Sequence, residues 1–212
     1  MNDIATAAPT EEPLGGTAPL TESVDLLDAQ LPTYDVVVTE HLVVEADPDR
    51  VFEAVRSFDF MTTRSPFITA AMTARALPGR LLGHGPEAPT TLMLARDQGA
   101  LPGWLVLAEA PGREVVFGAV GTFWTADIEW HDLTADQFAS FSAPGWGKIA
   151  CHLLVRPDGP GRSILTYECR TATTDPRSRS QMARYWWLIR PFVAYLLRAV
   201  LRTIRENVDA RA

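Results

Sequence analysis

The stretch RYWWLIRPFVAYLLRAVLRTIREN, residues 184–207, is apolar, rich in aromatic residues and interrupted by arginines. On a helical wheel its arginines collect on one side, and its large apolar residues collect on the other. Its longest run without a charge is 191–197, which is too short for a membrane span of about 20 residues. The pattern predicts an amphipathic helix whose apolar face must be buried against another element.

The sequence also predicts where this helix begins and ends. Asp175 is a good N-cap and Pro176 suits the first turn, so the helix is expected over 176–208. Pro191 lacks an amide hydrogen and should kink the helix. We expect the kink to open the mouth of a cavity beneath the helix.

The segments before this helix are predicted to form mainly strands, with two short helices after the first strand. A β-branched strand over 34–46, with Glu40 on its more apolar face, leads into a helix over 47–55, and a second helix is expected within 59–76. Further strands are predicted at 90–96, 103–109, 114–120 and 123–130, and then in the hairpin 147–155 and 163–173. An unbroken run of strands favours an antiparallel sheet, so the fold class is α+β, with a curved sheet wrapped around the C-terminal helix.

Charge is spread unevenly along the chain. Of the net charge of −7, residues 1–33 carry −6 and have no Lys or Arg, which predicts a disordered acidic tail before a domain over 34–212. Within this tail, VDLLDAQL (24–31) could form a short docking turn. Residues 34–212 are close to neutral, which argues against a nucleic-acid partner. Residues 175–212 carry +5. These arginines are explained either by attraction to the mildly acidic body or by an anionic partner or membrane surface.

Cysteines and histidines give no cofactor signal. Cys151 and Cys169 lack metal-like spacing and are expected as opposed free thiols in the second hairpin, in a reducing, cytoplasmic setting. The N-terminus lacks the pattern of a signal peptide. The four histidines, among them His84 and His152, lie far apart and are interpreted as surface or edge residues, so no metal is expected. No phosphate-binding loop or nucleophile motif is present, and no cofactor is expected.

Four segments carry a family resemblance. The START-like superfamily, also called SRPBCC, includes Bet v 1-like proteins and polyketide cyclases or dehydrases, and it is resembled by VTEHLVVEADPDRVFEAV (38–55), GREVVFGAVGTFW (112–124), APGWGKIACHLLV (143–155) and TYECRTATTDPRSRSQMARYWWLIRPF (166–192). The likeness covers about residues 34–208 and points to an uncharacterised bacterial branch. It implies a helix-grip fold with a cavity between sheet and helix that holds a lipid, sterol, hormone or polyketide. No catalytic residue is shared by the whole superfamily, so none carries over.

Polar residues inside apolar patterns are the candidates for chemistry. A cyclase or dehydratase would need an acid–base pair in the cavity, and Glu40, Tyr167, Glu168 and Arg170 are the candidates. Only one face of the last strand can point inward, and Glu168 paired with Arg170 on the outer face is the slightly favoured alternative. Candidate apolar contacts to a ligand come from the strands and from the helix: Trp104, Phe117, Trp124, Trp186, Ile189, Phe192, Val193 and Leu196.

Three functions therefore stay open. The first is binding of a hydrophobic small molecule by a monomer or homodimer. The second is a cofactor-free cyclase or dehydratase, and the third is a module that docks on a membrane surface or partner through the basic helix. The sequence does not decide between an enzyme and a binding protein.

Overall fold

The computed structural model describes residues 25–59, 103–125 and 127–211. A six-stranded antiparallel sheet has the order β1-β6-β5-β3-β2, with the short β4 paired to β3. The elements are α1 (Leu26–Gln30), β1 (Val36–Val44), α2 (Pro48–Arg56), β2 (Trp104–Ala110), β3 (Glu114–Gly121), β4 (Trp130–His131), α4 (Ala135–Phe138), β5 (Gly147–Pro157), β6 (Ser163–Thr173) and α5 (Pro176–Asp209).

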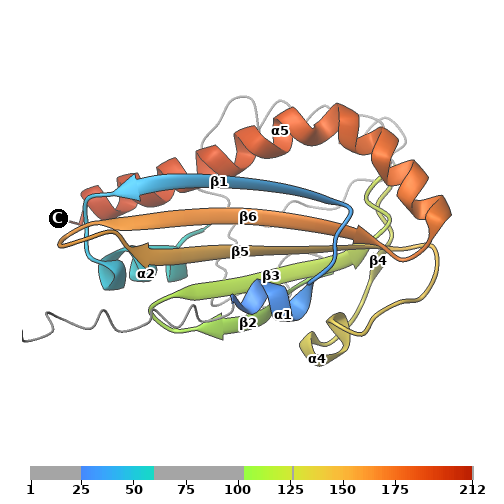
Figure 1. Ribbon diagram of the computed structural model, residues 1–212, viewed down its shortest axis with the longest axis horizontal. Helices are drawn as coiled ribbons and strands as arrows, with labels where there is room; N and C mark the ends of the chain where they lie inside the picture. The colour runs from blue at the N-terminus through green and yellow to red at the C-terminus, as the bar shows by residue number, and fades with distance from the viewer. Residues whose placement is uncertain (1–24, 60–102, 126, 212) are drawn as a thin grey trace, which may run out of the picture.

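The sheet has an inner face, which packs on α5 and α2, and an outer face, which carries α1. In Figure 1, α5 runs along the β1 side of the sheet for most of its length, while α1 and α4 lie toward β2 and β3. The expected α+β class and the helix-grip architecture are confirmed by this order of strands and helices. The order of elements that the resemblance implies is thus the one observed.

The long hairpin β5–β6 fixes which side chains face inward. Its register sets Cys151 opposite Cys169 and Leu153 opposite Tyr167, as the alternating pattern of the sequence predicts. The turn between the strands is closed by a backbone bond from Asp158 to Arg162, and Gly159 in it has a φ of +90°, which favours glycine. Residues of odd number in β5 thus join the inner core, and those of even number face outward.

Helix α5 begins where the sequence predicts. The Asp175 side chain accepts bonds from the backbone amides of Arg177 and Ser178, and the helix continues through Pro191 to Asp209. Its course is visibly bent (Figure 1). The C-terminal half inserts fully buried apolar side chains into the inner core: Leu197, Val200, Leu201, Ile204 and Val208.

The strand predicted over 123–130 is wrong except at its end, because only Trp130 and His131 pair with β3. Before them the chain makes a tight turn in which the Thr125 amide donates to the Thr122 carbonyl. The Thr125 hydroxyl lies 2.6 Å from the carbonyl oxygens of both Thr122 and Asp127 and can donate to either. Local side-chain bonds from threonine compete with strand pairing, and here they win. The connector after β4 contains α4, which starts with a capping box of Thr134 and Gln137.

The boundary of the N-terminal tail is also corrected. Residues 25–33 are folded, and α1 buries Leu27 and Leu31 against the outer face of the sheet. They meet a second apolar cluster formed by Leu107, Val116, Val120, Phe138 and Ala150. The disorder expected for 1–24, the helix expected in 59–76 and the strand expected at 90–96 fall wholly or almost wholly outside the described residues, as does His84.

Candidate functional site

Burial of the inner face changes along α5. Under the C-terminal half of the helix the inner cluster is closed, and Val200 and Ile204 are completely buried. Around the cluster, further apolar side chains are only partly buried, from the sheet as well as from residues 186–196 of the helix: Leu42, Trp104, Val106, Ile149, Cys169, Trp186, Val193, Ala194 and Leu196. These apolar side chains of helix and sheet are therefore incompletely covered.

Aromatic rings line the sheet side of this region. Phe117 of β3 lies 5.9 Å from Trp104 of β2 and 6.0 Å from Tyr167 of β6, measured between ring centroids. The tilted arrangement of the three rings is one that aromatic pairs favour. Two predicted ligand contacts, Trp104 and Phe117, are thus brought together on the inner face.

The helix side is supplied by residues 186–196 of α5. Trp186, Val193 and Leu196 pack on the inner cluster, and Ile189 and Phe192 are half-buried on the same helix. Five of the predicted contacts therefore share one stretch of helix. Its other side is open to solvent, since Trp187 is 83% exposed and Leu188 is 70% exposed.

Trp124 is the predicted contact that lies apart from the others. It lines a separate pocket of about 440 Å³ at the start of α5, together with Thr122, Gly145, Asp175 and Ser178. The structure does not bring it together with Trp104 and Trp186. Its displacement follows from the turn at Thr122–Thr125, which ends the extended course of the chain after β3.

Glu40 and Tyr167 are polar candidates on the inner face. They stand directly opposite each other on β1 and β6, and the Glu40 carboxylate is held by Arg198 of α5 at 2.8 Å. The pKa of Tyr167 is raised well above its ordinary value by burial and then by the neighbouring Cys151 and Cys169. Its hydroxyl is therefore protonated at neutral pH and can donate a hydrogen bond.

Glu168 and Arg170 lie on the outer face of the sheet. The prediction that they take part in chemistry in an inner cavity is therefore wrong. Nε of Arg170 donates to Oε1 of Glu168 at 2.6 Å, and the Thr39 hydroxyl donates to Oε2 at 2.8 Å. Alternation along β6 places both side chains opposite to Tyr167. The pairing on the outer face, which the sequence left as the favoured alternative, is the observed one.

The two cysteines are free and opposite each other, as predicted, and they lie on the inner face. Cys151 is buried and Cys169 is half-buried. Burial, and then the hydrogen bond with Cys169, raises the pKa of the Cys151 thiol well above its ordinary value. Such a thiol is a poor nucleophile, because the thiolate is the reactive form.

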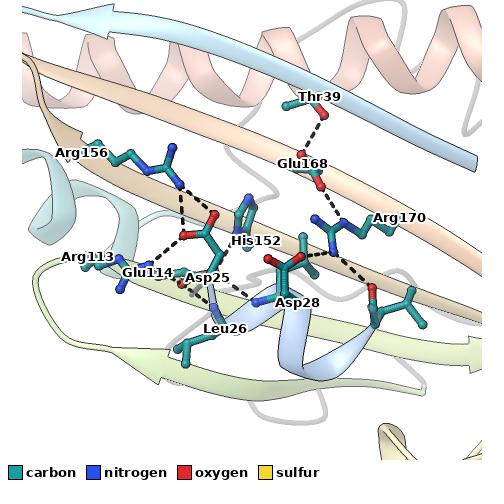
Figure 2. A network of polar contacts seen from close by, with 12 residues as sticks. Asp25, Leu26, Asp28, Thr39, Arg113, Glu114, His152, Arg156, Glu168 and Arg170 are labelled. Carbon is teal, nitrogen blue, oxygen red and sulfur yellow. Dashed lines mark hydrogen bonds and ion pairs between the residues drawn. The ribbon is translucent and has the colours of Figure 1, made fainter. Parts of the chain in front are cut away.

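A polar network on the outer face was missed by the sequence analysis (Figure 2). His152, expected at the surface, is 2% exposed beneath α1, and its Nδ1 lies 2.7 Å from Oε1 of the fully buried Glu114. Glu114 also accepts the backbone amides of Leu26 and Leu27. The available signal was a Glu and a His at outward positions of two strands that are apolar on both faces, which already indicates a covering element.

Part of the basic charge of α5 is neutralised by the body of the protein. Arg198 pairs with Glu40, and Arg179 pairs with Asp35 at 2.7 Å. Among the described helices, none is long and apolar enough to cross a membrane. Within the same residues, no group of three or more His, Cys, Asp or Glu could hold a metal ion.

Comparisons with known proteins give only distant structural likenesses. No family model matches the chain, and no curated protein does. Among solved structures, TTHA0849 from Thermus thermophilus is 12% identical, with 84% of this chain and 99% of that chain covered and a TM-score of 0.29. Ara h 8.0201 is 10% identical, with 82% and 98% covered and a TM-score of 0.30.

A further likeness is to the ZhuI aromatase/cyclase from Streptomyces sp. R1128. It is 15% identical, with 82% of this chain and 95% of that chain covered and a TM-score of 0.27. With TM-scores this low, the likenesses carry no argument about function. The assignment of the fold rests on the order of strands and helices in this chain.

Proposed function

We propose, from the helix-grip fold, that this protein binds a hydrophobic small molecule between the inner face of the sheet and residues 186–196 of α5. The observation that carries the proposal is the set of partly buried apolar side chains, with Trp104 on the sheet and Trp186, Val193 and Leu196 on the helix. Covering this surface with a ligand would add about 25 cal/mol for each Å² of apolar area removed from water. Aromatic walls suit a ligand with rings or a long acyl chain.

Few polar groups face this surface, and those that do can orient a ligand. The Tyr167 hydroxyl is a donor, and the Glu40–Arg198 pair closes the edge at β1. One or two such hydrogen bonds within an apolar site are typical of small-molecule sites. The ligand class is therefore an apolar molecule with a carbonyl or hydroxyl group.

Two adjacent tryptophans on α5 give a matched test. The purified chain is titrated with a panel of fatty acids, sterols and aromatic polyketides while tryptophan fluorescence is recorded, and the native mass of the protein is measured for co-purified ligand. Trp186→Ala should weaken binding at least tenfold, because Trp186 packs on the inner cluster, whereas Trp187→Ala should leave it unchanged, because Trp187 is 83% exposed. Equal effects of the two substitutions, or no ligand for the folded wild type, would refute the proposal.

A second candidate function is a cyclase or dehydratase. It is favoured by one observation, the position of Glu40 directly opposite Tyr167 on the inner face. A carboxylate and a neutral phenol at this spacing can accept and donate a proton on a folded substrate. Glu40→Gln and Tyr167→Phe should each lower turnover of a poly-β-ketone mimic by about 10²-fold or more while binding persists. If the wild type binds the mimic and does not turn it over, the cyclase or dehydratase function is excluded.

The third candidate, docking of the basic helix on a membrane surface, is favoured by the exposed Trp187 and Leu188 on α5. Salt-sensitive binding to anionic vesicles would support this function. Its absence at low ionic strength would exclude it.

A further inference from the structure

The outer face of the sheet holds both ends of the short helix α1. Oε2 of Glu114 accepts the Leu26 amide at 2.9 Å, and Oε1 accepts the Leu27 amide at 3.3 Å. At the other end, Nη1 of Arg170 donates to the Leu31 carbonyl at 3.1 Å. An anion at the amide end and a cation at the carbonyl end satisfy backbone groups that a helix leaves without partners.

The charges of α1 also meet their opposites on the sheet (Figure 2). Asp25 lies between Arg113 at 2.7 Å and Arg156 at 2.8 Å, and Asp28 pairs with Arg170 at 2.6 Å. We call the surface that receives α1 the outer-face cradle. It consists of Arg113, Glu114, His152, Arg156 and Arg170 with the apolar cluster around Val116.

Two leucines anchor α1 in the outer-face cradle. Leu27 is 0% exposed and Leu31 is 3% exposed, and they are one helical turn apart. Full burial of a leucine contributes about 1.5–3 kcal/mol. The outer-face cradle thus contacts four side chains of the α1 segment. They are an acid at the N-cap, a leucine at the second helical position, an acid at the third helical position and a leucine at the C-terminal end.

This contact is suited to opening and closing. A helix of five residues cannot persist without its support. Oε1 of Gln30 in α1 is buried and has no hydrogen-bond partner among the described residues. When α1 dissociates from the outer-face cradle, the charged side chains of the cradle can be hydrated again. The large free-energy cost of leaving buried charges without partners is therefore avoided.

We propose that the outer-face cradle is a docking site for a short acidic helix of a partner protein, and that residues 25–31 fill it in cis as a tethered competitor. The partner helix carries the pattern of DLLDAQL, with acids at the positions of Asp25 and Asp28 and leucines at those of Leu27 and Leu31. The site lies on the face opposite to the proposed ligand surface. Its existence is independent of what the inner face binds.

The test measures whether the outer-face cradle accepts such a helix in trans. A fluorescently labelled peptide of residues 22–33 is titrated against the full-length wild type and the full-length Leu27→Asp variant, whose own segment is released. We expect saturable binding to Leu27→Asp and at least tenfold weaker apparent binding to the wild type, because a tethered segment competes at an effective concentration of about 1 mM. Adding Arg170→Ala to the variant should weaken peptide binding about tenfold.

The matched control is a peptide with both leucines replaced by aspartate, which should not bind. Failure of the folded Leu27→Asp variant to bind the peptide, or equal binding of the control peptide, would overturn the proposal. If Leu27→Asp does not fold, hydrogen exchange of the wild type decides. The Leu27 amide should exchange at least 100-fold faster than that of Leu153 in β5, and equal protection of the two would show that α1 opens only with global unfolding.

Discussion

At the scale of single residues, Glu114 carries the most polar contacts of any fully buried side chain described. It accepts two backbone amides, lies 2.7 Å from His152 and is 3.8 Å from Arg113. Glu114→Gln removes the charge and places a side-chain NH2 group next to backbone amides that also donate. The free energy of unfolding should therefore fall by about 2–4 kcal/mol. Urea denaturation measures this. Glu109→Gln is the control, because its ion pair with Arg56 is solvent-exposed, and a change above about 0.5 kcal/mol there would contradict the contrast.

Asp175 gives a pH dependence at the same scale. The Ser178 hydroxyl, followed by the backbone amides of Ser178 and Gly145, lowers the pKa of Asp175 from 3.8 to about 2. Because the folded-state pKa lies below the unfolded one, the stabilisation is present above about pH 4 and is lost as the pH falls toward 2. Asp175→Ala should therefore be less stable than the wild type at pH 7, with the difference shrinking between pH 4 and pH 2.

Thermal unfolding across that pH range checks the role of Asp175. Asp175→Asn is the control, since an asparagine caps a helix without titrating in this range. Its difference from the wild type should be smaller at pH 7 than that of Asp175→Ala. A pH-independent difference for Asp175→Ala would refute the assignment.

At the scale of elements, Pro191 is expected to contribute to the bend of α5. It lies exposed inside the helix and cannot donate to the carbonyl four residues earlier. Pro191→Ala should raise the free energy of unfolding by about 1–3 kcal/mol and reduce the bend. If the bend opens the ligand surface, the same substitution should slow ligand association.

Urea denaturation and stopped-flow fluorescence with a bound ligand measure the two effects of Pro191→Ala. Ala194→Gly is a useful contrast on the same helix, because it loosens α5 without removing the proline. An unchanged association rate in a stabilised Pro191→Ala variant would mean that the bend has no role in access.

At the scale of the whole molecule, the sheet separates two apolar clusters. Leu27 belongs to the outer cluster and Val200 to the inner one. Leu27→Ala should cost about 2–4 kcal/mol, and Val200→Ala about 1–2 kcal/mol. Because the two residues share no partners across the sheet, the double variant should show the sum within about 0.5 kcal/mol in urea denaturation. A coupling above about 1 kcal/mol would indicate that the two layers are not independent.

Periodicity alone predicted much of the architecture. The limits of β6 and the start of α5 were predicted at the residues observed, and α2, β2, β3 and β5 within a few residues, because each has a clear apolar pattern and a turn or cap signal at its end. The strand at 123–130 failed because the local bonds of Thr122 and Thr125 outweigh its β-branched and aromatic composition. Strand propensity is a property of single residue types and does not include hydrogen bonds between side chains and the backbone.

The sequence by itself determined the fold class, the amphipathic character of α5 and the inner facing of Glu40, since these follow from periods of 3.6 and 2. It left open whether Tyr167 or the Glu168–Arg170 pair faces inward. Only the tertiary structure decided which polar residues share a site. The pairing of Glu40 with Arg198, and of Glu114 with His152 and α1, joins segments between 38 and 158 residues apart. Such contacts depend on strand order and on which element covers each face. Local pattern can indicate that a face is covered, but it gives neither the strand order nor the residues that meet there.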